Sequence, residues 1–468
     1  MSEPQSHLYR STRGGVVDAP FDRALLEGLA PDGGLYLPQA WPDYAASGLV
    51  ERAASTPYKD VCAEAIAPFV GPALPSEAVS QAAAEAAASF SHPDVTPLVE
   101  IAPGLHLLEL FHGPTLAFKD CAMQLIAPLT REALRARQER LLLLCATSGD
   151  TGAAAVRAFA NADRVDLVVL HPKGRVSDAQ RRQMTTCDAP NVLNLAVRGD
   201  FDDCQRILKA LTGDARLAEH RRVSTVNSIN WVRLAGQIPY YLRTVSQLAE
   251  PAHFVVPTGN LGDAFAGWVA RRCGAQMASM TAAVNSNDAL ARALETGRYE
   301  RRAATPTASV AMDVQAPSNL ERLIFEASGG DAEATRTIFE TFAKEGAVQI
   351  PEPIRHVAAG DLAAVSVSEA ETAQTIAETY KATGRVICPH TAVAMSVARR
   401  MPVDGAPKVV LATAHPGKFP ESVGAALGRA IDIPEALAGL ADLPEHMTEA
   451  DPEIDAVRDV IERRLAPA

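Results

Sequence analysis

One lysine in the segment FHGPTLAFKD, residues 111–120, is the first candidate for chemistry in this sequence. The chain has 44 lysine and arginine residues, of which only eight are lysines. An ammonium group can lose its proton when it is desolvated and then act as a nucleophile or a base, whereas a guanidinium stays charged. Lys119 is therefore a candidate catalytic lysine. The alternative is that it opens a helix surface and pairs with Asp120 or a later carboxylate.

The segment PTGNLGDA, residues 257–264, is a candidate phosphate-binding turn. Its glycines allow the backbone to turn tightly, so that N–H groups and the positive end of the following helix can hold a phosphate dianion. The segment is not Gly-x-Gly-x-x-Gly and contains no Gly-Lys-Ser/Thr, so it argues against a dinucleotide or nucleoside triphosphate. The alternative is a strand-to-helix turn that binds nothing.

The segment ATSGDTGAAA, residues 146–155, is a second loop between an apolar run and a helical pattern. Thr147, Ser148 and Thr151 offer hydroxyl and N–H groups at a helix start, which suits a carboxylate or a phosphate. Asp150 could instead serve only as the cap of that helix, as serine, threonine and aspartate commonly do.

The segment ATAHPGKF, residues 412–419, follows the last strong apolar run. Thr413 would point from a strand end toward the same crevice, although a single threonine at such a place is usually structural. We interpret His415 and Lys418 as capping or surface groups. A lysine, a phosphate-binding turn and a carboxylate-binding loop together match pyridoxal 5′-phosphate, because this cofactor is both an aldehyde and a phosphate ester.

Short apolar runs that alternate with helical patterns must position these groups. The runs favour buried parallel strands covered by helices on both faces, which predicts an α/β fold. In such sheets, ligands bind where loops leave the carboxyl ends of the strands. The expected strands lie at residues 141–147, 165–170, 191–197, 253–257 and 408–416.

The chain before residue 95 has a different texture, with turn-rich segments followed by an alanine-rich helical pattern. We therefore expect a separate N-terminal domain at residues 1–95. The segment from about 350 to 400 is expected to be mainly helical, and the charged C-terminal tail to form a final helix. No internal repeat or long linker is present, so the domains should pack closely.

Composition and charge exclude several classes of function. The chain has 468 residues, is 47% hydrophobic and 21% charged, and carries a net charge of −12. These values are typical of a soluble globular enzyme and argue against binding to a nucleic-acid backbone. No apolar run approaches the roughly 20 residues of a membrane span, and the first residues lack the apolar core of a signal peptide. We expect a cytoplasmic protein with no nucleic-acid or membrane partner.

The cysteines and histidines indicate neither a disulfide framework nor a metal site. The seven cysteines are odd in number and scattered, without a Cys-x-x-Cys pair. The eleven histidines show no His-x-x-x-His spacing. Reduced thiols and no metal are therefore expected.

Five motifs together resemble those of the threonine synthases, a fold type II family of pyridoxal-phosphate enzymes. FHGPTLAFKD, TSGDTGAA, NSINWVRLAGQ, PTGNLGD and TAHPGKF occur in the order and spacing of that family. The opening STRGG and DGGLYLP look like its longer form, which has an added N-terminal domain. The resemblance covers nearly the whole chain. It implies a catalytic region at 96–468 with two α/β subdomains, the smaller at about 121–240.

The resemblance implies that Lys119 forms the Schiff base with the cofactor. Thr413 is similar to the hydroxyl that meets the pyridine nitrogen, and a neutral partner there leaves this nitrogen largely unprotonated. Asp150 departs from the shorter relatives, which have asparagine at this position. The cofactor-binding residues implied are Lys119, Gly259, Asn260, Leu261, Asp263, Thr413 and Asp150.

The resemblance further implies a carbon–oxygen lyase that converts O-phospho-L-homoserine and water to L-threonine and phosphate, the last step of threonine biosynthesis. The substrate phosphate then needs its own cationic pocket. The segment KGRVSDAQRRQM, residues 173–184, is the densest basic stretch near a strand end. The substrate-binding candidates are Thr147, Ser148, Thr151, Ser177, Arg181, Ser228 and Asn230.

Two alternatives share part of these features. A serine or threonine dehydratase, or a β-replacement synthase, would keep the lysine, the phosphate-binding turn and the carboxylate-binding loop but would need no second phosphate pocket. A catalytically silent homologue would bind a phosphorylated metabolite as a regulator, although it would not need the imine-forming amine of Lys119. The protein itself is expected to be a monomer or a homodimer.

Overall fold

The computed structural model describes residues 5–465 of the chain. Its first part is built around a small antiparallel sheet of order β2-β1-β3, formed by β1 (Leu8–Ser11), β2 (Ala19–Pro20) and β3 (Tyr36–Pro38). The alanine-rich pattern forms one of the helices that follow, and its buried residues recur every three or four positions, as on one helix face. These helices are α1 (Phe21–Glu27), α2 (Leu49–Arg52), α3 (Tyr58–Val70) and α4 (Ser76–Ala88).

A six-stranded sheet of order β14-β11-β10-β15-β5-β4 forms the larger α/β subdomain, and all its neighbouring pairs are parallel except β4 with β5. Alternate residues of one strand face different layers: Phe254 and Val256 pack in the core that includes α11, whereas Val255 packs with α17. Helices therefore cover both faces. The strands are β4 (Leu98–Ala102), β5 (Leu105–Glu109), β10 (Ala252–Pro257), β11 (Met277–Val284), β14 (Ala363–Ser366) and β15 (Lys408–Ala412).

The helices of this subdomain follow its strands, and a two-stranded antiparallel pair, β12 (Arg298–Glu300) with β13 (Ala347–Gln349), lies among them. The helices are α10 (Ile238–Gln247), α11 (Gly262–Arg272), α12 (Ala289–Thr296), α13 (Leu320–Ala327), α14 (Ala332–Glu345), α15 (Glu352–Asp361), α16 (Glu369–Thr383), α17 (Pro389–Arg400), α18 (Pro420–Leu427) and α19 (Glu435–Ala438).

A five-stranded, fully parallel sheet of order β16-β8-β7-β6-β9 forms the smaller subdomain. Leu142 and Leu144 pack with α8 and α20, whereas Leu141 and Leu143 face the core shared with α5 and α6. The strands are β6 (Leu141–Ala146), β7 (Val165–Pro172), β8 (Val192–Val197), β9 (Arg222–Thr225) and β16 (Thr448–Ala450), and the helices are α5 (Lys119–Arg137), α6 (Asp150–Phe159), α7 (Asp178–Thr185), α8 (Phe201–Thr212), α9 (Trp231–Ala235) and α20 (Ile454–Arg464).

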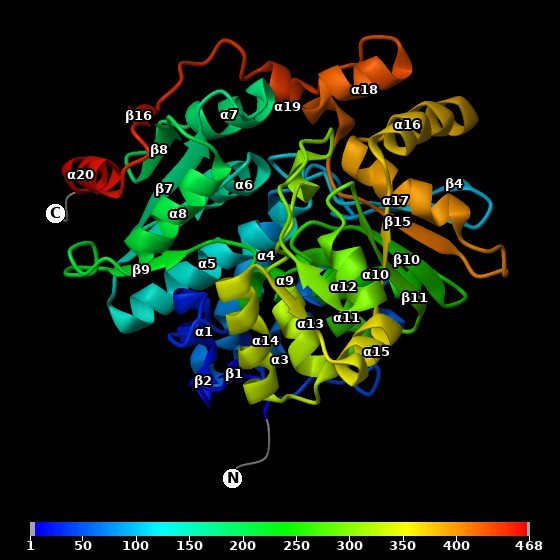
Figure 1. Cartoon of the computed structure of the whole chain (residues 1–468), viewed down its shortest axis with the longest axis horizontal. Coiled ribbons are helices and arrows are strands. Elements are labelled where there is room, and N and C mark those ends of the chain that lie inside the picture. Colours follow the sequence, from blue (N-terminus) through cyan, green and yellow to red (C-terminus); the bar gives the residue numbers. More distant parts are fainter. Residues whose placement is uncertain (1–4, 466–468) are drawn as a thin grey trace.

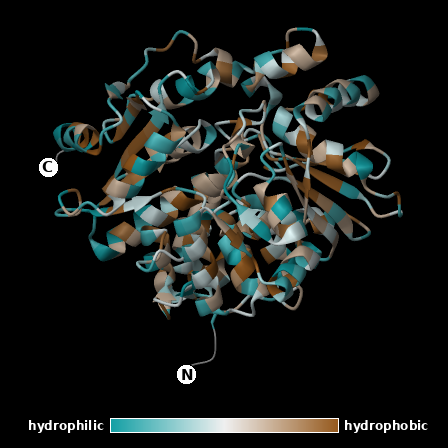
Figure 2. Ribbon diagram, viewed as in Figure 1, coloured by the Kyte–Doolittle hydropathy of each residue, from teal (hydrophilic) through white to brown (hydrophobic). Residues whose placement is uncertain are grey.

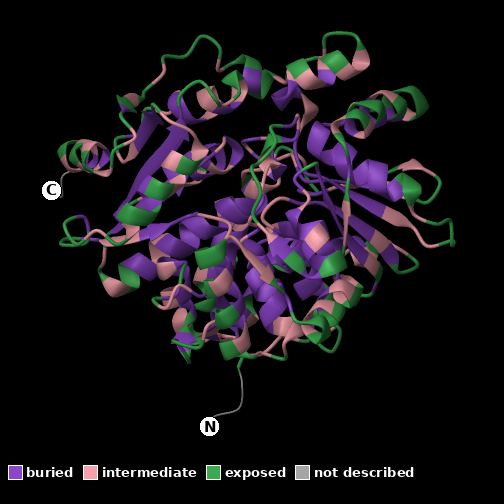
Figure 3. Ribbon diagram, in the orientation of Figure 1, coloured by how far each residue is buried: buried purple, intermediate pink, exposed green. Residues whose placement is uncertain are grey.

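The two sheets lie side by side, with the smaller one on the left and the larger one on the right of Figure 1. The chain from α18 to α20, orange to red, passes along the top edge from one side to the other. Apolar residues concentrate in the strands of both sheets (Figure 2), and the same strands are buried, whereas outward helix faces are exposed (Figure 3). The predicted α/β fold with parallel sheets and an added N-terminal domain is confirmed.

Candidate active site

Lys119 is the first residue of α5. The loop that precedes α5 is held in place by hydrogen bonds to the Asp120 side chain. The buried Asp120 carboxylate accepts hydrogen bonds from the N–H and the hydroxyl of Thr115, each at 2.8 Å. A Cβ added at Gly113 would lie 2.5 Å from the Asp120 side chain, so only glycine fits there. Asp120 is thus committed to Thr115, and the pairing of Lys119 with Asp120 that the sequence left open is not formed.

The start of α5 is attached to the loop that follows β15. The N–H of Phe118 donates to the carbonyl oxygen of Thr413 at 2.8 Å, and Ala117 forms a bridge with Ala414. Because β15 is the parallel neighbour of β10, the loops after both strands leave the same edge of the larger sheet. Lys119, Thr413 and the 257–264 turn therefore belong to one site, as the sequence predicted for carboxyl strand ends.

Two lysines flank one buried carboxylate. The Lys119 Nζ lies 3.4 Å from Oδ2 of Asp150, and the Lys418 Nζ lies 2.8 Å from Oδ1. Lys418 also donates to the carbonyl oxygen of Thr115 at 2.7 Å and has no exposed surface. The interpretation of Lys418 as a capping or surface group is therefore wrong, whereas His415 does cap the short helix that follows it.

The pKa values of Lys119 and Asp150 are both lowered, for different reasons. Burial lowers the pKa of Lys119, with Asp150 opposing this effect and the positive charges of Arg233 and Lys418 adding to it. Burial alone would raise the pKa of Asp150, but the ammonium groups of Lys418 and Lys119 hold it well below its usual range. The site therefore combines a stable carboxylate with an amine that loses its proton more easily than a free lysine, as a nucleophile requires.

The turn after β10 presents backbone donors to the site. Leu261 has a left-handed backbone (φ 61°), and α11 starts at the next residue. A Cβ at Gly259 would lie 2.6 Å from the carbonyl oxygen of Ala311, so close packing fixes the turn. Within residues 5–465, the N–H groups of Gly259, Asn260 and Leu261 have no acceptor. Free N–H groups at a helix start form an anion site.

Asp263 takes part in this turn through its backbone only. Its Oδ1 accepts hydrogen bonds from the hydroxyls of Tyr240 at 2.5 Å and Tyr241 at 2.8 Å. Burial raises the pKa of this carboxyl to about 6. The side chain thus points into the core between α10 and α11, and any contact of Asp263 with a cofactor phosphate stays a prediction for its N–H group.

The 146–155 loop divides its hydroxyl groups between folding and binding. Thr147 Oγ1 accepts hydrogen bonds from the N–H groups of Gly149 at 2.9 Å and Gly152 at 3.0 Å, so it shapes the loop. Ser148 and Thr151 are half-buried, and their hydroxyls have no hydrogen-bond partner among the described residues. These two remain the candidates for a substrate carboxylate at the start of α6.

In the basic segment 173–184, Ser177 caps a helix and Arg181 is already paired with carboxylates. Ser177 caps α7 by accepting from the N–H of Gln180. The Arg181 guanidinium contacts the carboxylates of Glu445, at 2.8 Å and 3.1 Å, and of Asp178, at 2.6 Å. Arg181 would have to exchange these partners to bind a substrate phosphate, and its role there stays a prediction.

The NSIN segment reaches the site through Ser228. The Asn319 side chain donates to the carbonyl oxygens of both Ser228 and Asn260, which brings Ser228 next to the phosphate-binding turn. Asn230 is instead occupied: it donates to the Leu25 carbonyl oxygen at 2.9 Å and caps α9.

Arg233 is a further candidate site residue, which the sequence analysis did not single out. It is 4% exposed and donates to the Val226 carbonyl oxygen at 3.1 Å, while its Nε has no partner. No carboxylate lies within salt-bridge distance of it in residues 5–465. A Cβ at Gly236, one turn further along, would lie 3.0 Å from Ala122 Cα, in the first turn of α5 after Lys119. Burial lowers the pKa of Arg233 to about 10, and a buried cation without a carboxylate invites an anionic ligand.

The donor set fits a phosphorylated aldehyde cofactor. Lys119 supplies the amine, the N–H groups of residues 259–261 supply anion donors, and the side chain of Thr413, 5% exposed, makes no hydrogen bond within the described part of the chain. No cluster of three or more histidine, cysteine or acidic side chains suited to a metal occurs in residues 5–465. No described helix is long and apolar enough to cross a bilayer.

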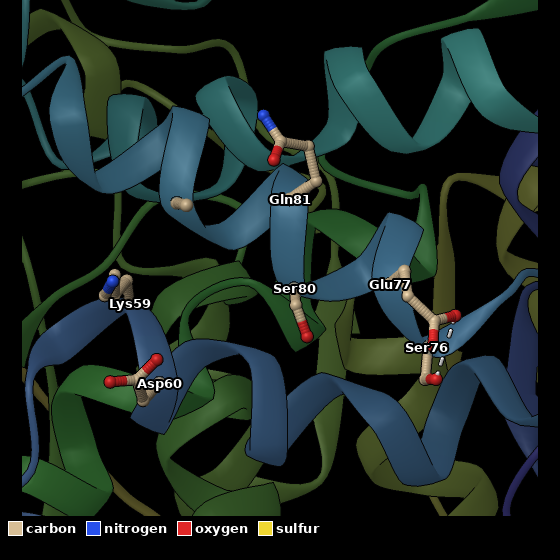
Figure 4. Close-up of a pocket in the computed structure, with 7 residues that line it drawn as sticks. Lys59, Asp60, Ser76, Glu77, Ser80 and Gln81 are labelled. Carbon is tan, nitrogen blue, oxygen red and sulfur yellow. Dashed lines mark hydrogen bonds between the residues drawn. The ribbon is translucent and has the colours of Figure 1, made fainter.

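A separate hollow of about 360 Å³ lies between α3 and α4 in the N-terminal domain (Figure 4). Its polar side chains stand apart, and the one hydrogen bond among those drawn joins Ser76 to Glu77. The hollow therefore lacks the convergent buried charges found around Lys119.

Three family models match the chain in succession. Threonine synthase N terminus matches residues 8–87, pyridoxal-phosphate dependent enzyme matches residues 91–414, and threonine synthase C-terminal matches residues 391–461.

Individual relatives match over nearly their whole length. The chain is 39% identical to the threonine synthase of Pseudomonas aeruginosa, over 96% of this chain and 97% of that protein. The crystal structure of the pyridoxal-phosphate-bound threonine synthase of Brucella melitensis superposes with a TM-score of 0.94 and 41% identity, covering 98% and 99% of the two chains. The yeast threonine synthase structure gives a TM-score of 0.92 and 33% identity, with 98% and 99% covered.

Proposed function

The chain belongs to the threonine synthase family of pyridoxal-phosphate-dependent enzymes, and we propose that it converts O-phospho-L-homoserine and water to L-threonine and phosphate with Lys119 as the catalytic lysine. Membership of this family makes the chain a lyase of threonine biosynthesis that uses pyridoxal phosphate. The observation that carries the residue assignment is the Lys119 amine, 13% exposed, which lies beside Asp150 in the same site as a turn with free N–H groups.

Lys119 is proposed to move the protons of the reaction. When bound, pyridoxal phosphate supplies an electron sink for the carbon next to the substrate amino group. Lys119 removes protons from Cα and Cβ of the substrate, and its lowered pKa favours the unprotonated amine that this requires. The Cγ–O bond breaks and phosphate leaves with the bridging oxygen. Water adds its hydroxyl at Cβ, while protons return to Cα and Cγ, so that Cγ becomes the methyl group of threonine.

The anionic groups are proposed to bind at three places. The N–H groups of residues 259–261 would hold the cofactor phosphate, and the Ser148 and Thr151 hydroxyls at the start of α6 would hold the substrate carboxylate. For the substrate phosphate we propose Arg233, because this guanidinium is buried and has no carboxylate partner among the described residues. Ser228, five residues earlier in the chain, is a further polar candidate for this phosphate. Arg181 is the second candidate, since its guanidinium is already paired with Glu445.

A heavy-oxygen experiment tests the reaction itself. Incubation of O-phospho-L-homoserine with the enzyme in heavy-oxygen water should give threonine labelled at its hydroxyl, because that oxygen comes from solvent. The phosphate should carry no solvent label, because the bridging oxygen leaves with it. Mass spectrometry of both products measures this.

Other products would support the alternatives. Phosphatase action would give homoserine, a dehydratase would release a keto acid and ammonia from serine or threonine, and a silent homologue would release nothing. Any of these as the main outcome, or unlabelled threonine, would refute the proposed reaction.

Thr413 is proposed to donate its hydroxyl to the pyridine nitrogen of the cofactor. Thr413→Ser keeps the donor and should be mild, whereas Thr413→Val leaves a buried acceptor without it, which typically costs ~1–3 kcal/mol. We therefore expect a kcat decrease of roughly 5- to 150-fold for the valine variant only. Steady-state kinetics of both cofactor-loaded variants measures this. Equal rates for the serine and valine variants would remove Thr413 from the site.

We propose that the protein is cytoplasmic. We also propose that it is a monomer or a homodimer in which each chain carries a whole site. The proposed oligomeric state is supported by the contacts of Asp150, because Lys119, Lys418 and Gln180 of the same chain bind this carboxylate. Light scattering of the loaded enzyme distinguishes the two oligomeric states.

A further inference from the structure

Lys418 is the more firmly held of the two lysines that flank Asp150. Its Nζ lies 2.8 Å from Oδ1 of Asp150, and the Nζ of Lys119 lies 3.4 Å from Oδ2. The Lys418 side chain is fully buried, whereas 13% of the Lys119 side chain is exposed. Lys418 also donates to the Thr115 carbonyl oxygen. It therefore ties together the loop that carries Lys119, the 146–155 loop and the end of β15.

Of the two lysines, the cofactor would bind covalently to Lys119 and would leave Lys418 as a free ammonium. Bound pyridoxal phosphate would engage the Lys119 nitrogen through its aldehyde, and this nitrogen would then hold at most one proton and could not serve Asp150 as a three-donor ammonium. Lys418 would then be the one lysine ammonium within 4 Å of Asp150 in the described part of the chain, and the remaining hydrogen bond, from Gln180 at 2.9 Å, is uncharged. A buried carboxylate without a cation takes up a proton or loses its place.

We propose that Lys418 is a positioning residue that acts through Asp150: it is the permanent counter-cation that keeps this carboxylate charged and in place while Lys119 is engaged by the cofactor. The inference rests on the proposed function and deepens it, because Asp150 receives the Lys119 amine each time that amine is released during turnover. An asparagine at position 150 would need no such partner, whereas an aspartate does. Lys418 thus explains how this chain tolerates a buried carboxylate at this position.

The other titratable groups around the pair cannot replace Lys418. His390, whose pKa burial lowers to about 4, is uncharged near neutral pH and accepts from the Ala311 N–H. Asp120 is bonded to Thr115, and the lone Nη1 bond of Arg233 goes to Val226. A change in acid sensitivity on loss of Lys418 therefore reports on Asp150.

The test compares Lys418→Met, Asp150→Asn and the double variant, each loaded with pyridoxal phosphate. Lys418→Met should move the acidic limb of the kcat profile, and the acid transition of the visible cofactor absorption, upward by at least about one pH unit. The sign follows because a buried carboxylate without a cation is protonated at higher pH. The double variant should lack the shift and be about tenfold more active than Lys418→Met, since the two changes compensate.

Lys408→Met is the matched control. Lys408 lies at the start of β15, the strand that leads into the loop of Lys418, and its ammonium donates to the carbonyl oxygens of Ala398 and Met401, away from Asp150. Its removal should leave both pH profiles unchanged. The absorption readout requires no turnover, so it tests Lys418 even if the parent forms no threonine and the proposed reaction fails.

Two outcomes would overturn the inference. One is an absorption titration of Lys418→Met that superimposes on that of the parent enzyme. The other is a double variant no better than Lys418→Met, as a purely packing role predicts. If Lys418→Met alone does not fold, the comparison moves to the double variant, which should yield a folded, cofactor-binding protein if charge compensation is the role and should fail as well if packing is.

Discussion

Lys119→Arg is expected to abolish threonine formation, with a loss on the order of 10³-fold or more in kcat, because a guanidinium can neither form the imine nor exchange protons. The positive charge beside Asp150 would be kept, so the fold should be preserved. Threonine formation from O-phospho-L-homoserine and the visible absorption of the variant measure the two consequences. Activity within tenfold of the parent would exclude Lys119 as the catalytic lysine.

Chemical trapping identifies the reactive lysine independently. Borohydride reduction of the parent enzyme, followed by peptide mapping, should place the pyridoxyl mass on the peptide that contains Lys119. Lys418 is the decisive competitor, because its amine lies beside the same carboxylate. The exposed Lys173, which pairs with Glu449, serves as a matched control. Label on Lys418 or Lys173 would reassign the site.

Arg233→Gln is expected to lower kcat/KM for O-phospho-L-homoserine by roughly 10²-fold or more, because loss of a buried charged partner of a phosphate costs several kcal/mol. The cofactor absorption should remain, since cofactor and substrate phosphates bind in different places. Inhibition by inorganic phosphate should weaken in parallel. Steady-state kinetics and phosphate inhibition constants measure the effect.

Arg181→Gln is the informative comparison. This change breaks the pair with Glu445, so it should affect stability and have a smaller effect on kcat/KM. Arg206→Gln, on the exposed face of α8, is a control that should be neutral. A large, substrate-selective loss in Arg181→Gln with a near-normal Arg233→Gln would assign the substrate phosphate to Arg181.

Local sequence patterns were sufficient for the α/β class and for five of the parallel strands. Runs such as LLLLCA and HFVVP are apolar at successive positions because both faces of their strands are buried, and the following small-residue turns mark where helices begin. Loops at the carboxyl ends of such strands must meet, so the sequence also brought Lys119, the 257–264 turn and Thr413 into one site. Six strands of the two sheets were not expected: β5 and β11 inside the larger sheet, and the edge strands β4, β14, β9 and β16. Of these, β14 lies in a segment expected to be helical, and β16 lies in the tail expected to form the final helix.

The hydrogen-bond and ion-pair partners of individual polar side chains could be identified only from the tertiary structure. The local sequence around Pro416 and Gly417 does not show whether the next residue, Lys418, is buried or exposed. In the structure Lys418 is fully buried and pairs with Asp150, which lies more than 260 positions earlier in the chain. The Thr147 hydroxyl accepts hydrogen bonds from N–H groups of its own loop, whereas the hydroxyl of the neighbouring Ser148 has no partner among the described residues.

The α/β class, the family motifs and Lys119 as a candidate catalytic lysine could therefore be predicted without a structure, since these depend on local periodicity and on residue types in short segments. The tertiary structure alone decided that Asp150 is shared by two ammonium groups, that Arg181 is occupied and that Arg233 is free of carboxylates in the described chain. The physical reason is that burial patterns repeat along a strand or helix and are readable locally. Hydrogen-bond and charge partners are instead chosen by which distant segments the fold brings within about 3 Å of each other.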